Sequence, residues 1–214
     1  MPDIRKVPRD GVRMNGMEPI TLSTPRLLLR PFEERDVEAV FAACQDPAIR
    51  RWIPVPDPYE RGHAEDFVRN TSPAAWREDT MYNFGVFTRD GTLTGSMGLV
   101  RLALLRTTEH QAELGFWAAP EQRGKGYTDE AARAVIDWAF GGLGVERLEW
   151  VAQTGNDGSL AVARKLGFVV EGVQRARIVH RGTRRDAWIG ALLPSDWGRG
   201  SPTPYLPGPE AAGG

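Results

Sequence analysis

Hydrophobic and polar positions follow two periods along this chain, and segments of one period alternate with segments of the other. Apolar residues at every second position, rich in β-branched and aromatic types, predict strands at 20–30, 82–88, 93–102, 112–118, 147–153, 168–175 and 186–193. Apolar residues three and four positions apart predict helices at 36–44, 59–71, 127–140 and 159–166. Asp90-Gly91 joins two alternating runs and predicts a hairpin turn. The pattern therefore predicts a single α/β domain.

The two ends of the chain differ from the part between them. Residues 1–18 are polar and carry glycine and proline, and residues 198–214 form a low-complexity tail. Neither segment has enough apolar residues to form a packed core. We therefore expect a flexible N-terminal segment (1–18) and a flexible C-terminal tail (198–214) on either side of a domain at 19–197.

A glycine turn between a strand and a helix is the most informative local feature. After Pro120, residues 123–128 (RGKGYT) lead directly into the helix at 127–140. Glycines let the backbone curl tightly, and the free N–H groups at a helix start attract anions. The turn has neither the spacing of a P-loop nor the three glycines of a Rossmann turn. It predicts a phosphate or pyrophosphate site of another kind.

A second segment of the chain carries another recognisable motif. The strand at 147–153 is followed by residues 156–159 (NDGS), which open a helix that ends in 165–168 (KLGF). With residues 24–31 (TPRLLLRP) upstream and Glu171-Gly172 downstream, the Arg-x-x-Gly-x-Thr turn resembles the RimJ/RimL-like branch of the GNAT acyl-CoA N-acyltransferases, which includes ribosomal-protein N-terminal acetyltransferases. The resemblance spans 20–197. Thr128 departs from the small residue that usually ends the family's turn.

This resemblance implies the GNAT fold, a single mixed and mostly antiparallel sheet with a splayed central strand pair and flanking helices. It also implies acetyl-CoA as acyl donor and direct attack of a primary amine on the thioester. The acceptor is expected to be a protein or peptide N-terminus or a small-molecule amine. An antibiotic-modifying enzyme, an enzyme using a longer acyl-CoA and a non-catalytic CoA-binding regulatory module are the alternatives.

The cofactor residues implied by the resemblance fall in three segments. The strand backbone would pair with pantetheine and polarise the thioester carbonyl, the glycine turn would hold the pyrophosphate, and the cap of the later helix would contact the cofactor. These residues are Phe116, Trp117, Ala118, Arg123, Gly124, Lys125, Gly126, Tyr127, Thr128 and Asn156. As a favoured N-cap residue, Asn156 is also explained by the helix start alone.

Two residues are expected to move protons. In RimL-like enzymes the residue at the Ser159 position reaches the sulfur as general acid, whereas many other GNAT enzymes use a tyrosine four residues later, where this chain has Ala163. Glu113 precedes the cofactor-facing part of its strand and is the candidate base, with a solvated strand face as the competing interpretation. The three histidines, His63, His110 and His180, are expected at the surface.

Two aromatic residues are expected in the acceptor site. Trp52 lies in the loop that shapes the acceptor pocket in this family, and Tyr82 occupies the position at which some relatives carry a glutamate. Trp138, Trp150 and Trp188 lie in periodic elements and are expected in the core. A group of arginines near the last hairpin favours a solvated face over a site for an anionic substrate, and comprises Arg175, Arg177, Arg181, Arg184 and Arg185.

Composition and charge argue against several classes of protein. The net charge of −1 argues against a nucleic-acid partner, and no apolar run is long enough to span a membrane. The single cysteine, Cys44, excludes an internal disulfide and is expected to be a small buried residue. The histidine, cysteine and acidic residues lack metal-site spacing, so no metal is expected. A cytoplasmic location and a homodimer complete the expectations.

Overall fold

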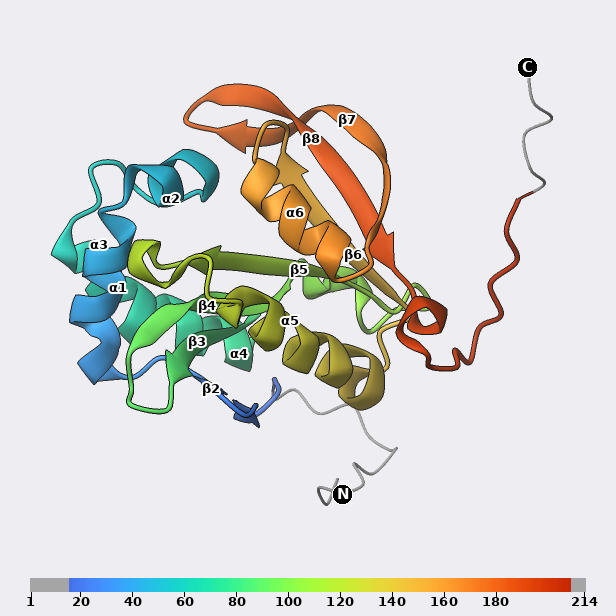
Figure 1. Ribbon diagram of the computed structural model, residues 1–214, viewed down its shortest axis with the longest axis horizontal. Coiled ribbons are helices and arrows are strands. Elements are labelled where there is room, and N and C mark those ends of the chain that lie inside the picture. Colours follow the sequence, from blue (N-terminus) through green and yellow to red (C-terminus); the bar gives the residue numbers. More distant parts are fainter. Residues whose placement is uncertain (1–15, 209–214) are drawn as a thin grey trace.

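The computed structural model describes residues 16–208 of the chain and has one eight-stranded mixed sheet with helices packed against it (Figure 1). The strands are β1 (Leu22–Ser23), β2 (Leu27–Arg30), β3 (Tyr82–Thr88), β4 (Leu93–Val100), β5 (Gln111–Ala118), β6 (Arg147–Gln153), β7 (Val169–His180) and β8 (Thr183–Leu192). They lie in the order β1-β2-β3-β4-β5-β6-β8-β7, and only β5 and β6 are parallel. The predicted fold class is confirmed.

Six α-helices and several shorter turns connect the strands that the structure describes. The helices are α1 (Val37–Cys44), α2 (Pro47–Trp52), α3 (Arg61–Asp66), α4 (Ser72–Arg77), α5 (Tyr127–Trp138) and α6 (Asp157–Lys165). Helices α3 and α5 each continue as one π-helical turn, at Phe67–Thr71 and Ala139–Leu143. Short 3₁₀ turns occur at Glu34–Asp36, Leu102–Leu104, Pro120–Gln122 and Pro194–Trp197.

Some predicted boundaries change for identifiable reasons. The predicted strand at 20–30 is divided into β1 and β2, because Pro25 has no N–H to donate and the Thr24 N–H bonds back to the Leu27 carbonyl (3.0 Å). The last hairpin is longer than predicted. It turns at Arg181 and Gly182, both with positive φ (49° and 68°). Arg184 and Arg185 pair with Val179 and Ile178, whereas Arg175 and Arg177 lie in an irregularity of the ladder between Gln174 and Ile178.

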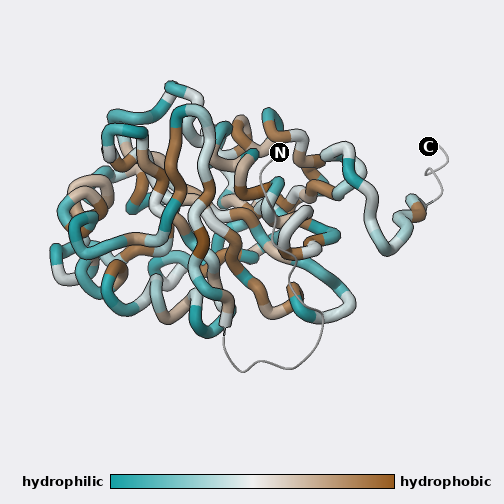
Figure 2. The backbone as a smooth tube through the Cα atoms, turned by 90° about the horizontal axis from the view of Figure 1, so that it is seen from below, coloured by the Kyte–Doolittle hydropathy of each residue, from teal (hydrophilic) through white to brown (hydrophobic). Residues whose placement is uncertain are grey.

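Two hydrophobic cores hold the layers together. The larger core packs α5 and α6 against the sheet around Trp150, Leu148 and Leu114, and the smaller core packs α1 and α3 against Phe87 and neighbouring residues. Figure 2 shows the hydrophobic segments mostly in the middle of the molecule and the hydrophilic ones mostly around its periphery. The sheet is therefore a rigid support from which turns and strand ends project.

Strands β5 and β6 separate along their length. They pair only at Gln111 with Arg147, Ala112 with Leu148 and Glu113 with Glu149. Beyond Glu113 the two strands diverge, which confirms the predicted splayed pair. The remaining part of β5 keeps β4 as its neighbour on the other side.

The predicted flexible ends lie partly outside the described residues, which exclude 1–15 and 209–214. Residues 198–208 contain no helix or strand, and Figure 1 shows them leaving the domain beyond the final 3₁₀ turn. Ser201 and Thr203 both bond to the Glu146 carboxylate, at 2.7 and 3.1 Å. Within residues 16–208, no helix combines the length and the apolar character that crossing a bilayer requires.

Candidate active site

The gap between β5 and β6 exposes the backbone of β5. The Ala119 N–H donates to the Thr94 carbonyl beside β4 (2.9 Å), in register with the strand pairing that precedes it. Backbone groups of residues two apart in a strand point the same way, so Trp117 also faces β4. Phe116 and Ala118 point their N–H and C=O groups toward the gap, where the Ala118 carbonyl already accepts from Arg123 Nε (3.3 Å). An extended ligand can therefore pair with these two residues.

This geometry changes the expected role of one residue in the 116–118 segment. The backbone polar groups of Trp117 are directed to β4 and are not available to a ligand in the gap. Its side chain packs against the smaller core instead. Because backbone groups alternate along the strand, those of Phe116 and Ala118 face the gap and those of Trp117 face β4.

The glycine turn forms a ring of free amides at the start of α5. Gly124 and Gly126 have φ values of +76° and +77°, which glycine adopts without strain. Within residues 16–208, the amides from Gly124 to Thr128 have no hydrogen-bond acceptor. These donors converge at the positive end of the α5 dipole. The free amides of residues 124–128 offer the donors that a pyrophosphate needs, whereas the Arg123 N–H already donates to the Pro120 carbonyl (3.4 Å).

An ion-pair clamp holds this turn against the first strands. Glu130, in the first turn of α5, accepts hydrogen bonds from the Thr24 hydroxyl (2.5 Å) and from Arg26 Nε (2.5 Å). Arg26 also donates to the Lys125 carbonyl (3.1 Å), and its guanidinium lies 4.9 Å from the centre of the Tyr127 ring. Thr24 and Arg26, which belong to the 24–31 motif of the family resemblance, therefore hold the glycine turn in position.

Arg123 ties the turn to two other elements. Its Nε donates to the Ala118 carbonyl (3.3 Å), and its terminal nitrogen pairs with Asp46. Asp46 in turn caps α2, since its side chain accepts the Ala48 N–H (2.9 Å). Arg123 therefore links the end of β5 to the N-terminus of α2.

Ser159 lies in the first turn of α6 with its hydroxyl held in place. The Asn156 side chain accepts the Ser159 N–H (3.3 Å), so Asn156 is the N-cap of α6. The indole N–H of the buried Trp150 donates to Ser159 Oγ (2.9 Å). Because the oxygen accepts from Trp150, the hydroxyl hydrogen is free to be donated elsewhere. Ala163, at the family's tyrosine position, is fully buried and offers no alternative acid.

Glu113 lies at the closed end of the gap, on the last residue that β5 pairs with β6. Its side chain is 13% exposed, and Arg101 Nε lies 2.9 Å from its Oε2 without the alignment of a hydrogen bond. Burial raises the pKa of Glu113 from its ordinary 4.5 to about 7, partly offset by the charges of Arg101 and Arg177. A carboxyl that titrates at neutral pH is suited to accept a proton.

The two residues expected in the acceptor site, Trp52 and Tyr82, lie in different parts of the structure. Trp52 ends α2 with its indole against Gly155, next to the start of α6, and Arg51 lies over its ring at 4.5 Å. Tyr82 is fully buried, donates its hydroxyl to Asp79 (2.5 Å) and packs between Trp76 and Trp138. Burial against an acidic partner raises the pKa of Tyr82 above its usual range. Packing explains Tyr82, whereas Trp52 lies next to the loop that joins β6 to α6.

A cleft of about 370 Å³ opens beside Trp52, between α2 and the β7–β8 hairpin. Its walls come from three distant parts of the chain and are Pro47, Arg50, Arg51, Asp57, Gln153, His180, Arg181 and Arg185. Gln153 is the last residue of β6, so the cleft adjoins the open end of the gap. Two of the five arginines assigned to a solvated face, Arg181 and Arg185, line this cleft.

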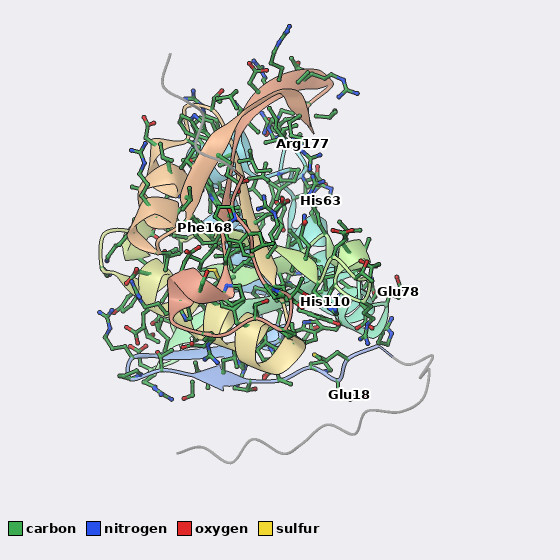
Figure 3. The ribbon with its side chains drawn as sticks, turned by 90° about the vertical axis from the view of Figure 1, so that its right-hand side faces the viewer. Glu18, His63, Glu78, His110, Phe168 and Arg177 are labelled. Carbon is green, nitrogen blue, oxygen red and sulfur yellow. The ribbon has the colours of Figure 1, made fainter. Side chains whose placement is uncertain are left out.

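Other candidate chemistry is absent from the described residues. Within residues 16–208, no group of three or more histidine, cysteine or acidic side chains can hold a metal ion. Cys44 is buried, and burial raises the pKa of its thiol to about 11, so it is a poor nucleophile. His63 and His110, labelled in Figure 3, lie on other elements than the gap-lining segments.

Several functional candidates were not visible in the sequence. Trp150 was expected as a core residue only, and nothing local indicates that its N–H holds Ser159. Helix α2 had a signal that was missed, since Asp46-Pro47 is an N-cap followed by proline at the first helical position. The clamp between Arg26 and Glu130 and the arginine-lined cleft join residues far apart in the chain.

Comparisons with known proteins agree with this geometry. Residues 26–169 match the family model described as acetyltransferase (GNAT) domain. The chain is 31% identical over 173 residues to YoaA of Bacillus subtilis, an uncharacterized N-acetyltransferase, covering 80% of this chain and 96% of YoaA. It is 32% identical over 141 residues to YdaF of the same organism, named as a candidate ribosomal N-acetyltransferase, covering 64% and 75% of the two chains.

A solved structure shows the same architecture over most of the chain. It is described as a candidate ribosomal-protein-serine acetyltransferase from Vibrio cholerae, with a TM-score of 0.73 and 26% identity, and the match covers 81% of this chain and 97% of that one. The free amides at 124–128, the splayed strands and these similarities agree, and the chain belongs to the GNAT family of acetyltransferases, which use an acyl-CoA and an amine.

Proposed function

We propose that this protein transfers an acetyl group from acetyl-CoA to a primary amine at the gap between β5 and β6. The observation that carries the proposal is the continuity of two sets of backbone donors. The free amides of residues 124–128 offer a pyrophosphate site, and the gap-facing edge of β5 at Phe116 and Ala118 follows it within the same connected segment. Only a ligand with a diphosphate joined to an extended amide chain uses both sets, and CoA has this form.

The residues around the gap have the roles that acyl transfer requires. The thioester supplies the acyl group when acetyl-CoA is bound. The gap-facing N–H of Phe116 or Ala118 can polarise the thioester carbonyl. Glu113, with its pKa raised to about 7, can accept the proton of the attacking amine directly or through water. Ser159, with its oxygen fixed by Trp150, can donate a proton to the departing sulfur.

The acceptor that we propose is a protein or peptide N-terminus, with small-molecule amines as the alternative. The names of YdaF and of the Vibrio cholerae protein support a ribosomal-protein acceptor in related chains. The open cleft near Trp52 supports an acceptor that enters between α2 and the β7–β8 hairpin. A short peptide segment can lie in such an open cleft with its amine toward the gap.

The test is release of free CoA thiol from acetyl-CoA in the presence of a panel of amines. The panel contains peptides of varied N-terminal sequence, amino acids, spermidine and an aminoglycoside, and mass spectrometry locates the acetyl group. We expect amine-dependent thiol release and a product heavier by one acetyl group. CoA binding without turnover on any amine would contradict the proposed enzyme and favour a CoA-binding module. Faster turnover with a longer acyl-CoA would contradict acetyl-CoA as the donor.

Assembly and location are the remaining parts of the proposal. We expect a cytoplasmic homodimer, as in the branch that the sequence resembles. The edge strand β7 leaves the valines at 169, 173 and 179 more than half exposed, which supports an apolar contact between copies. Light scattering over a wide range of protein concentration should give the mass of a dimer, and a constant monomer mass would contradict it.

A further inference from the structure

The cleft beside Trp52 has an unusual charge for a site that receives an amine. Four arginines, at 50, 51, 181 and 185, line it against a single carboxylate, that of Asp57. Most amines are cations at neutral pH, so a bare polyamine would meet repulsion from several charges at short range. The positive charge of the cleft therefore favours an acceptor that carries negative charge in addition to its amine.

The single carboxylate is already shared by two of the arginines. Asp57 Oδ1 lies 2.8 Å from Arg50 Nη1, and Asp57 Oδ2 lies 2.8 Å from Arg181 Nη1. Arg181 also donates to the Arg50 carbonyl (2.9 Å), which fastens the hairpin to α2. These contacts fix the shape of the cleft but neutralise only part of its positive charge.

The other two arginines are not neutralised at all. Among the described residues, neither Arg51 nor Arg185 has an ion pair, and Arg51 is held only over the ring of Trp52. Two buried nitrogens of the cleft residues, Arg50 Nε and His180 Nε2, also have no hydrogen-bond partner within residues 16–208. Arg51 and Arg185 are exposed at the cleft, so their guanidiniums are free to bind an anion, and the buried Arg50 Nε adds a donor without a partner in the described part of the chain.

We propose that the acceptor carries a carboxylate near its amine, and that the arginines of this cleft bind this carboxylate while the amine faces the gap. The inference rests on the proposed function, since it names the chemistry of the acceptor for the same site. The acceptor class is a peptide with an acidic residue close to its N-terminus. The positive walls also favour the neutral form of the bound amine, which is the nucleophilic form.

The orientation follows from the position of the cleft. Gln153, the last residue of β6, lies at the wall of the cleft nearest the gap, whereas Arg181 and Arg185 belong to the hairpin. An acceptor with its carboxylate on the hairpin arginines directs its amine toward β5. Arg177, labelled in Figure 3, comes from the same hairpin, and its charge also acts on Glu113.

The experiment compares matched peptides on the wild-type protein and on two variants. The peptides are identical except that aspartate and glutamate at the second and third positions are replaced by asparagine and glutamine, or by lysine. The variant is Arg185→Gln, and the control is Arg184→Gln, which removes the same charge from the neighbouring residue that bonds to the Ala176 carbonyl. The measurements are kcat/KM by thiol release and peptide affinity by calorimetry in the presence of CoA.

We expect the acidic peptide to exceed its amide match by at least about tenfold in kcat/KM, and the lysine peptide to be the poorest. Arg185→Gln should remove most of this preference, Arg184→Gln should retain it, and raising the salt concentration should reduce it. Equal turnover of acidic and amide peptides would overturn the inference and leave the proposed function standing. Absence of turnover with preferential calorimetric binding of the acidic peptide would support the anion site and contradict the proposed enzyme.

Discussion

The two halves of the candidate site are built from different parts of the polypeptide. The cofactor half is almost entirely backbone, with free amides at 124–128 and an unpaired strand edge at Phe116 and Ala118. The acceptor half is almost entirely side chain, with arginines from α2 and from the β7–β8 hairpin. Backbone donors depend on conformation and recognise what every CoA ester shares, whereas side chains can differ from one relative to another. In the function that we propose, this division separates recognition of the acyl donor from the choice of acceptor.

The largest effect is expected at Glu113, at the closed end of the gap. Replacing Glu113 by Gln removes the base that we propose and should lower kcat by about 10²- to 10⁴-fold. In the wild-type protein, kcat/KM should rise with pH up to about 7 and then level off, because only the ionised carboxylate accepts a proton. A pH–rate profile of both proteins measures this. An unchanged profile in Glu113→Gln would return Glu113 to the role of a buried strand residue.

The stability of the same variant distinguishes function from packing. The fold raises the pKa of Glu113 above its ordinary 4.5, so the carboxyl favours folding when protonated and loses this contribution as pH rises toward 7. The neutral amide of Gln does not ionise. Glu113→Gln should therefore melt at a higher temperature than the wild-type protein at pH 8, while being less active.

The next largest effect concerns the cofactor half. Gly126→Glu places a negative side chain where the pyrophosphate should approach, on a residue whose φ of +77° strains any other amino acid. CoA affinity should fall by about 10²-fold or more by calorimetry. Gly91→Glu is the matched control, since Gly91 has a φ of +88° and nothing within 4 Å of an added Cβ. Equal CoA affinity in the two folded variants would contradict the pyrophosphate assignment.

The smallest of these effects is expected at Ser159. Ser159→Ala removes the proposed acid and should lower kcat by about 10²-fold, with CoA affinity nearly unchanged. Ser159→Thr keeps the hydroxyl and should retain much of the activity. Near-normal turnover of a well-folded Ser159→Ala protein would leave the serine as an ordinary residue of the first helical turn.

The difference between the halves also explains what the sequence could predict. The glycine turn and the N-cap at Asn156 are local, because a few adjacent residues set the backbone conformation on which each depends. The strand alternation placed Glu113 and the 116–118 segment in the correct strand. It did not reveal the hydrogen-bond register between β4 and β5, which was needed to separate Trp117 from Phe116 and Ala118.

The arginine-lined cleft could not be predicted from local sequence patterns. Arg50 and Arg181 are 131 residues apart in sequence, and their contact depends on how far the hairpin reaches over α2. A run of arginines on a strand has the same local pattern whether it faces water or a cleft. The burial of Tyr82 could not be predicted from its own strand either. It depends on Trp76 and Trp138, which lie on helices from other segments of the chain.

The most direct test of the account is amide hydrogen exchange measured with and without bound CoA. If the cofactor half binds through its backbone, saturation with CoA should slow exchange in peptides covering 114–118 and 123–128. Peptides covering α2 and residues 178–185 of the hairpin should exchange at unchanged rates. Calorimetry on the same sample confirms that CoA is bound. Unprotected amides at 123–128 in CoA-saturated protein, or protection confined to the arginine-lined cleft, would contradict the account.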